Sequence, residues 1–435
     1  MKKLLSLLLA LALALSCAGA VAEEALPLET KTTVAVNAET MTALLGGALG
    51  TDDAQLPQLL VSLISALGVH SVAAETGTQT EVTLKDTPVL TFSCAPAEEG
   101  LALVSDLFPS YAIVVPQETL AQFSGLDEEA LAPYITALTA HIQNFSAAAM
   151  AKAGAPEQGE FTFGEVTFNT KVPVEMTLGE LAQLERELLK ALAADETLGP
   201  VLASVEGFDL EALSQTLTPS EEDAAAPVQA AVYLNMDAEG NADENVYATV
   251  RIVISSTSVA LDASVVAGSV YCNLLMGDPA YATAEALAEA AGSTSDAMQL
   301  ALSIIPGEGE NMQMELWLVT AGTPMGAVFA TAAAEAGLTE TVSLYLGDAS
   351  SPLLTLTGVT VPGGEIAPVS LEGKTLVTLE QLTNDEEGTL VQGLVMDVMG
   401  YGLNNLIANA AAVMPDEVSA LVELLAPAED TAEAE

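Results

Sequence analysis

A strand-like segment that runs directly into a capped helix constrains the fold of this chain more than any other stretch. From Glu160 to Met176, apolar residues interleave with small and polar ones in a nearly alternating pattern, which indicates a half-buried strand. The pattern changes at Thr177, which together with Glu180 matches a capping box, where each side chain accepts a hydrogen bond from the other residue's backbone amide. The sequence therefore predicts a helix that begins just after Thr177.

The predicted helix carries leucines along one face and charged residues on its other faces, as expected for an element that packs on a sheet. We expect it to end at Gly199 and Pro200. Its leucine face either fills the core beneath the sheet or lines an apolar groove. The candidate groove-lining residues are Leu181, Leu184, Leu188 and Leu192.

The rest of the chain repeats this combination of strands and helices. Short β-type runs separated by turn residues fill 69–115 and 228–361, and runs this close in sequence usually pair antiparallel. Helical periodicity returns in 40–67, 117–150 and 389–426. We therefore expect an α+β fold in which antiparallel sheets pack against amphipathic helices.

Shifts in composition divide the chain into two tandem units and flanking segments. Small residues around Gly154 and Pro156 mark a linker, and the acidic C-terminus has the composition of a disordered tail. The expected parts are a signal peptide at 1–22, an N-terminal α+β unit at 23–155, a larger α+β unit at 160–385, C-terminal helices at 386–427 and an acidic disordered tail at 428–435.

The N-terminus has the features of a bacterial secretory signal. Two lysines precede the apolar run Leu4 to Leu15, and Ala20 to Ala22 form a small-residue cleavage site. We expect a secreted or cell-envelope protein. The alternative is a lipid anchor on Cys17, although Ala14 departs from the leucine that such signals usually carry. After the signal, no apolar run reaches the ~18 residues of a transmembrane helix.

Acidic residues greatly outnumber basic ones. The chain has 60 Asp and Glu against 10 Lys and Arg, a formal charge of −50, which becomes −52 when the signal peptide takes its two lysines away. Proteins that bind nucleic acid neutralise phosphates with basic patches. The remaining basic residues are scattered, so we exclude nucleic acid as a partner.

No motif for catalysis, a cofactor or a metal is complete. The loop 237–245 resembles a calcium loop, but Ala242 and Ala248 occupy the positions of its essential glycine and glutamate, so we interpret it as a hairpin turn. The only histidines, His70 and His141, are too few for a His-rich zinc site. We predict no enzyme activity and no cofactor, with a pair of carboxylates brought together by folding as the remaining route to catalysis.

Cys94 and Cys272 either form a disulfide or are two independent thiols.

The segment Phe161 to Asp195, with the hairpins that follow it and the turn Asp237 to Asn241, resembles uncharacterised secreted proteins and lipoproteins of Gram-positive anaerobes. These in turn resemble the lipoprotein-carrier (LolA-like) half-barrels. The resemblance rests on element order over about the middle half of the chain. It implies a curved antiparallel sheet wrapped around helices, and it assigns no functional residue.

These observations favour a binding protein that holds a hydrophobic or lipid-like ligand between sheet and helices. The alternative is a structural or surface-interaction protein of the cell envelope with no small ligand. An enzyme is the third possibility.

Overall fold

The computed structural model describes residues 27–50, 54–74, 76–98, 100–116, 128–204, 212–214, 218–309, 311–334, 337–366, 368–385 and 388–425. The predicted signal peptide, the alternative lipid anchor at Cys17 and the acidic tail lie outside these residues. Both compact units below consist of mostly antiparallel strands and helices, which confirms the α+β class.

The chain divides into two compact units that do not follow the expected consecutive ranges 23–155 and 160–385. Unit 1 comprises Met1–Gly125, Ala330–Leu344 and Ser350–Glu435, and unit 2 comprises Leu126–Phe329 and Tyr345–Ala349. Long-range strand pairing explains the difference, because β17 (Leu354–Pro362) pairs along its whole length with the first strand, β1 (Leu28–Val36).

Unit 1 contains an antiparallel sheet in the order β16-β17-β1-β2-β3-β4-β5-β6, extended by a parallel pairing of β18 with β6. The bounds of its remaining strands are β2 Leu67–Ala74, β3 Gly77–Leu84, β4 Thr87–Ala97, β5 Gly100–Ser105, β6 Tyr111–Pro116, β16 Gly337–Leu346 and β18 Thr375–Thr378. Tyr345 and Leu346 at the end of β16 belong to unit 2.

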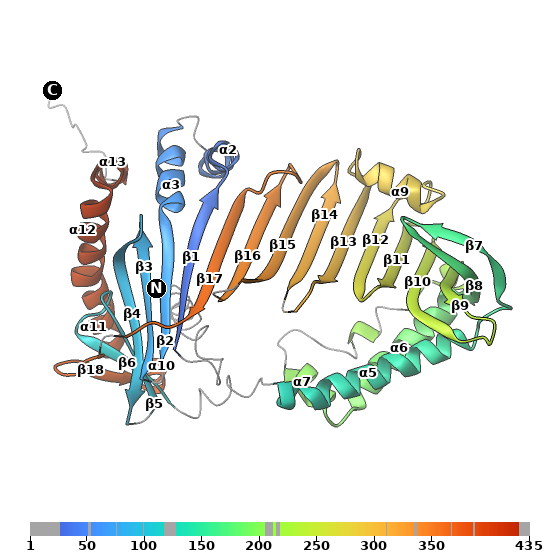
Figure 1. Ribbon diagram of the computed structural model, residues 1–435, viewed down its shortest axis with the longest axis horizontal. Helices are drawn as coiled ribbons and strands as arrows, with labels where there is room; N and C mark the ends of the chain where they lie inside the picture. Colours follow the sequence, from blue (N-terminus) through green and yellow to red (C-terminus); the bar gives the residue numbers. More distant parts are fainter. Residues whose placement is uncertain are drawn as a thin grey trace. The chain divides into compact units, whose positions relative to one another are not determined.

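Helices from both ends of unit 1 complete its core (Figure 1). Phe92 on β4 and Leu103 on β5 are buried with Leu394, and Leu84 and Val89 are buried with Met414. The C-terminal helices therefore pack on the strands of the N-terminal region. The helices are α2 Ala38–Leu49, α3 Gln55–Ser65, α10 Leu379–Thr383, α11 Thr389–Asp397, the π-helix η2 Val398–Gly402, α12 Leu403–Val413 and α13 Pro415–Leu425.

Unit 2 contains an antiparallel sheet in the order β7-β8-β9-β10-β11-β12-β13-β14. Figure 1 shows that β7 to β9 turn away from the plane of the later strands, so this sheet is curved. The bounds are β7 Glu157–Phe163, β8 Val166–Thr177, β9 Pro227–Met236, β10 Ala242–Val253, β11 Ser258–Val266, β12 Ser269–Gly277, β13 Ala297–Pro306 and β14 Met312–Thr320. The next strand, β15, spans Thr323–Ala334, of which Thr323–Phe329 belongs to unit 2.

Helices cover both faces of this sheet. Leu181 of α6 packs on Val174, whereas Leu287 of α9 packs on Ala260. The strand register places Val250, a neighbour of α6, and Ala260 on opposite faces, so α6 and α9 lie on opposite sides. The bounds are α5 Glu128–Met150, α6 Leu178–Ala194, α7 Leu198–Ser204, the 3₁₀-helix η1 Asp223–Ala225 and α9 Ala284–Ala291. No described helix is long and apolar enough to cross a membrane.

The capping box at the start of α6 is confirmed. The Thr177 hydroxyl accepts a hydrogen bond from the Glu180 amide at 3.3 Å, and the Glu180 carboxylate accepts one from the Thr177 amide at 2.9 Å. The predicted end of the helix is wrong, since α6 stops at Ala194. Asp195 accepts hydrogen bonds from the amides of Thr197 and Leu198 and so caps α7, which begins at Leu198. The first turn of α7 tolerates Pro200 because the missing N–H has no intrahelical partner there.

Thr177→Ala is expected to lower the free energy of unfolding of unit 2 by about 1 kcal/mol, because the Glu180 amide loses its cap. Urea unfolding followed by the emission of Trp317, the only tryptophan and a residue of unit 2, measures this change. Lys190→Ala, an exposed change in the same helix, is the control and should alter stability by less than about 0.5 kcal/mol. Equal midpoints for Thr177→Ala and the parent protein would contradict the assignment.

Cys94 and Cys272 are both free thiols, which corrects the disulfide alternative. Cys94 lies in unit 1 and Cys272 in unit 2.

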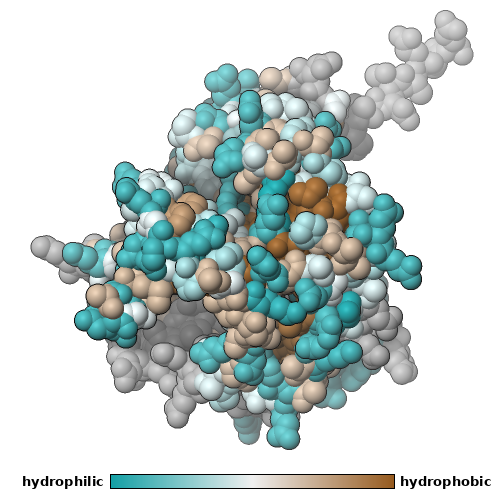
Figure 2. Space-filling model, turned by 90° about the vertical axis from the view of Figure 1, so that its right-hand side faces the viewer, coloured by the Kyte–Doolittle hydropathy of each residue, from teal (hydrophilic) through white to brown (hydrophobic). Residues whose placement is uncertain are grey.

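On the face drawn in Figure 2, hydrophobic residues are interrupted by hydrophilic ones, so the hydrophobic residues do not cover this face continuously.

Candidate ligand-binding groove

Strand register places tall and short side chains alternately across one face of the sheet of unit 2. Tyr247 on β10 pairs with Ser264 on β11, which pairs with Tyr271 on β12, which pairs with Ser303 on β13. Directly paired residues project from the same face. Two aromatic rings therefore stand on either side of a serine.

A neighbouring row, two residues along each strand, adds a third aromatic residue. Asp262 on β11 pairs with Asn273, Asn273 with Ala301, and Ala301 with Trp317 on β14. Aromatic residues thus occur on β10, β12 and β14, and short residues lie on β11 and β13 between them. A groove of about 480 Å³ follows this face and is lined by residues of both rows.

The spacing of the strands sets the width of the groove. Neighbouring strands lie about 4.8 Å apart, so Tyr247 on β10 and Tyr271 on β12, which flank Ser264 in one row, stand on strands roughly 9.6 Å apart. Subtracting the ~3.4 Å thickness of an aromatic ring leaves a gap of roughly 6 Å, enough for one planar ring or one compact head group.

Trp317 is held flat on the sheet by its neighbours. A Cβ atom at Gly326 on β15 would overlap Cε3 of the indole, so the ring occupies the space above this glycine. Tyr345 contacts the ring with a centroid separation of 4.9 Å. The indole Nε1 donates to Glu315 Oε2 at 3.0 Å, and Gln313 donates to the other carboxylate oxygen at 2.5 Å. One face of the indole therefore lies over the backbone at Gly326, and Trp317 lines the groove from β14.

The opposite wall is fixed by aromatic stacking. Phe163 on β7 stacks on Tyr247 with centroids 3.9 Å apart and planes 13° apart. Burial, together with the charge of Asp262 and a hydrogen bond to it, raises the pKa of Tyr247 well above its ordinary value. The tyrosine therefore stays neutral and donates to the carboxylate of Asp262.

The floor of the groove is polar, and its charge is negative. Gln299 donates to Asn273 at 2.8 Å, which places an amide pair between the walls. Among the described lining residues, Asp262 and Glu315 are charged, and none is Lys, Arg or His. Within the described part of the chain no three potential ligands gather into a metal site. The groove can thus offer aromatic faces, amide groups and two carboxylates.

The predicted lining residues lie elsewhere, on α6. Leu181 and Leu184 pack against the core formed with Val174 and Val228. Leu184 and Leu188 line a second cavity of about 200 Å³, which faces His141 and Phe145 of α5. Leu192 is partly buried but is not among the residues that line this cavity. None of the four lines the sheet groove.

The predicted hairpin turn at 237–245 is confirmed, because Met236 and Ala242 pair across it. The Asp237 carboxylate accepts hydrogen bonds from the amides of Glu239 and Asn241, so it closes the turn.

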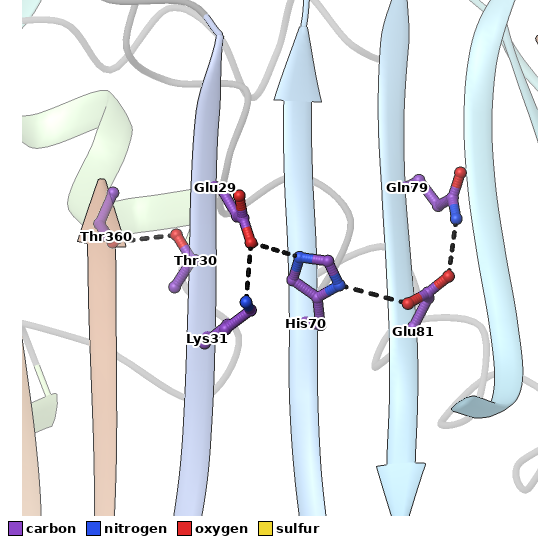
Figure 3. Close-up of polar contacts among 7 residues, drawn as sticks. All are labelled: Glu29, Thr30, Lys31, His70, Gln79, Glu81 and Thr360. Atoms are coloured by element: carbon purple, nitrogen blue, oxygen red, sulfur yellow. Dashed lines mark hydrogen bonds and ion pairs between the residues drawn. The ribbon is translucent and has the colours of Figure 1, made fainter. Parts of the chain in front are cut away.

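A polar cluster in unit 1 contains His70 (Figure 3). Its Nε2 lies 3.1 Å from Glu29 Oε1 on β1, and its Nδ1 lies 3.2 Å from Glu81 Oε2 on β3. A hydrogen bond from Lys31, with a further one from His70, lowers the pKa of Glu29. Both ring nitrogens are engaged, so the cluster links three neighbouring strands.

Comparisons with protein-family models, with curated proteins and with solved structures found no match to this chain. The resemblance to lipoprotein-carrier half-barrels therefore stays a prediction.

Gly326→Ala is expected to displace the indole of Trp317, because the new methyl group would overlap the ring. The displaced ring should become more accessible to water, and acrylamide should quench its emission more strongly. Gly47→Ala is the control, since a Cβ at Gly47 meets nothing within 4 Å. Unchanged quenching in Gly326→Ala would show that the indole does not lie above Gly326.

Proposed function

We propose that this chain is an exported, non-catalytic binding protein whose ligand occupies the groove on β10 to β14. Export rests on the predicted signal peptide. The observation that supports ligand binding is a sheet face on which Tyr247 and Tyr271 flank Ser264 and Trp317 stands in the next row. The groove volume of about 480 Å³ is within the usual range of roughly 300 to 1,000 Å³ for small-molecule sites.

The wall residues suit this role because they can contact a ligand without losing core packing. Tyr271 is 42% exposed, so its ring is free to contact a ligand. Aromatic side chains supply a large contact area with little loss of conformational entropy on binding. The amide pair of Gln299 and Asn273 adds the few directional polar groups that typically orient a ligand.

The single tryptophan makes this proposal testable. We would titrate the protein with tetramethylammonium, maltotriose and laurate, which represent a cation, a neutral sugar and a lipid, and follow the emission of Trp317. At least one probe should give a saturable change, and Tyr271→Ala should weaken that binding at least tenfold. Tyr401→Ala, which removes a 65% exposed ring from unit 1, is the matched control and should bind normally. No response to any probe, or normal binding by Tyr271→Ala, would contradict the proposal.

The cavity beside α6 supports a second candidate, the hydrophobic ligand expected from the sequence. Its volume of about 200 Å³ is below the usual range, so it suits only a short apolar group. If this cavity is the site, laurate should raise the unfolding midpoint of the parent protein, and Leu188→Ala should change that rise.

The stability of Leu188→Ala separates a vacant cavity from a filled core. Truncation at a cavity wall forfeits fewer contacts than truncation in a packed core, so the loss should fall below the usual core range of about 2 to 5 kcal/mol. A core-sized loss without any effect of laurate would leave a structural role for this helix face.

A further inference from the structure

We infer that the groove selects a small organic cation that carries an alkylated ammonium group. This inference rests on the proposed function, because it names the ligand class of the same groove.

Charge complementarity is the first argument. The chain carries a formal charge of −50, and the described groove lining contributes Asp262 and Glu315 without a basic residue. Such a surface attracts cations and repels anions. Arg251 lies on the same sheet face, but its Nη2 donates to the Ser258 hydroxyl and to the carbonyl of Tyr281, which directs it away from the groove lining.

The aromatic walls are the second argument. A cation centred above Ser264, between Tyr247 and Tyr271, lies roughly 4.8 Å from the strand of each tyrosine, which is within the ~6 Å reach of a cation–π interaction. Trp317 lies in the neighbouring row on β14 and adds an indole, the most favourable ring for this interaction. The gap between the two tyrosines thus matches the size of an alkylated ammonium group.

The hydrogen bonds of the carboxylates favour an alkylated group over a primary ammonium. Both oxygens of Glu315 already accept hydrogen bonds, from Trp317 and Gln313, and Asp262 accepts one from Tyr247. These bonds use acceptor positions but leave the negative charges in place. A primary ammonium needs partners for three N–H groups, whereas a quaternary ammonium needs only charge and aromatic contact.

Calorimetric titration with choline and with 3,3-dimethylbutan-1-ol, its uncharged isostere, tests the inference. Choline should bind the parent protein at least tenfold more tightly than the isostere. Glu315→Gln keeps an acceptor for the indole but removes the charge, and it should weaken choline binding at least fivefold. Glu244→Gln is the matched control, because Glu244 is exposed on β10 and is not among the lining residues. It should change choline binding by less than twofold.

Glu315→Gln also changes the hydrogen bond that holds the Trp317 indole. Asp262→Asn removes the other charge of the lining without changing that bond, and it should weaken choline binding in the same way. Equal affinity for choline and the isostere, or unchanged choline binding in both variants, would overturn the cation inference while ligand binding in the groove stands. If maltotriose binds and choline does not, the cation inference is likewise overturned while ligand binding in the groove stands. If choline, the isostere, maltotriose and laurate all fail to bind, the proposed function fails as well.

Discussion

Leu287→Ala is expected to lower the free energy of unfolding of unit 2 by about 2 to 5 kcal/mol. Leu287 is the fully buried centre of the contact between α9 and the sheet. It fills the space above Gly277, where a Cβ would lie 2.8 Å from its Cδ2 atom. Its buried neighbours include Ala260, Ala290 and Ala297, which are too small to close the cavity that truncation leaves.

The packing of α9 on the sheet also supports the floor of the groove. The row of Ala260 and Leu275, which α9 covers, is adjacent to the row of Asp262 and Asn273 in the groove floor. Urea unfolding followed by Trp317 emission measures the change. Leu316→Ala, which truncates a leucine that is 47% exposed on β14, should cost less than about 1 kcal/mol. A similar loss for both variants would mean that α9 is not packed as described.

Asp397→Ala is expected to destabilise unit 1 by about 1 to 3 kcal/mol for each hydrogen-bond donor that it leaves without a partner. Asp397 is 5% exposed at the end of α11. Its two carboxylate oxygens accept hydrogen bonds from the amide and the hydroxyl of Ser110, both at 2.8 Å. The side chain therefore joins the C-terminal helices to the segment that leads into β6.

Thermal unfolding followed by far-UV circular dichroism measures this loss, because Trp317 reports on unit 2. Asp397→Asn retains one carbonyl acceptor and is the matched control, with a smaller expected loss. Hydrogen exchange at the Ser110 amide should become faster in Asp397→Ala. Protection equal to that of the parent protein would show that this contact contributes nothing.

Local features of the sequence predicted local structure well. The capping box at Thr177 and Glu180 involves residues three apart, so it can be identified without knowledge of the fold. The end of α6 was harder to predict, because Asp195 can either extend a helix or cap the next one, and only the hydrogen bonds to Thr197 and Leu198 decide.

The groove depends on information that no single strand contains. Alternation within β12 assigns Tyr271 to one face, but only the register with β11 and β13 places serines beside it. Pairing of β1 with β17 likewise joins residues more than 300 positions apart, for which turn chemistry gives no signal. Leucines on α6 were conspicuous because of their helical spacing, and spacing alone cannot separate a packed face from a ligand site.

The cross-peak of the Trp317 indole N–H in a ¹H–¹⁵N spectrum tests the central claim most directly. The chain has one tryptophan, so this peak is unique, and its proton is donated to Glu315 in the groove wall. Saturating tetramethylammonium should shift the peak in the parent protein, and Tyr271→Ala should reduce the shift at equal ligand concentration. An unchanged indole peak, while other resonances respond to the cation, would place binding elsewhere and contradict the assignment of the groove.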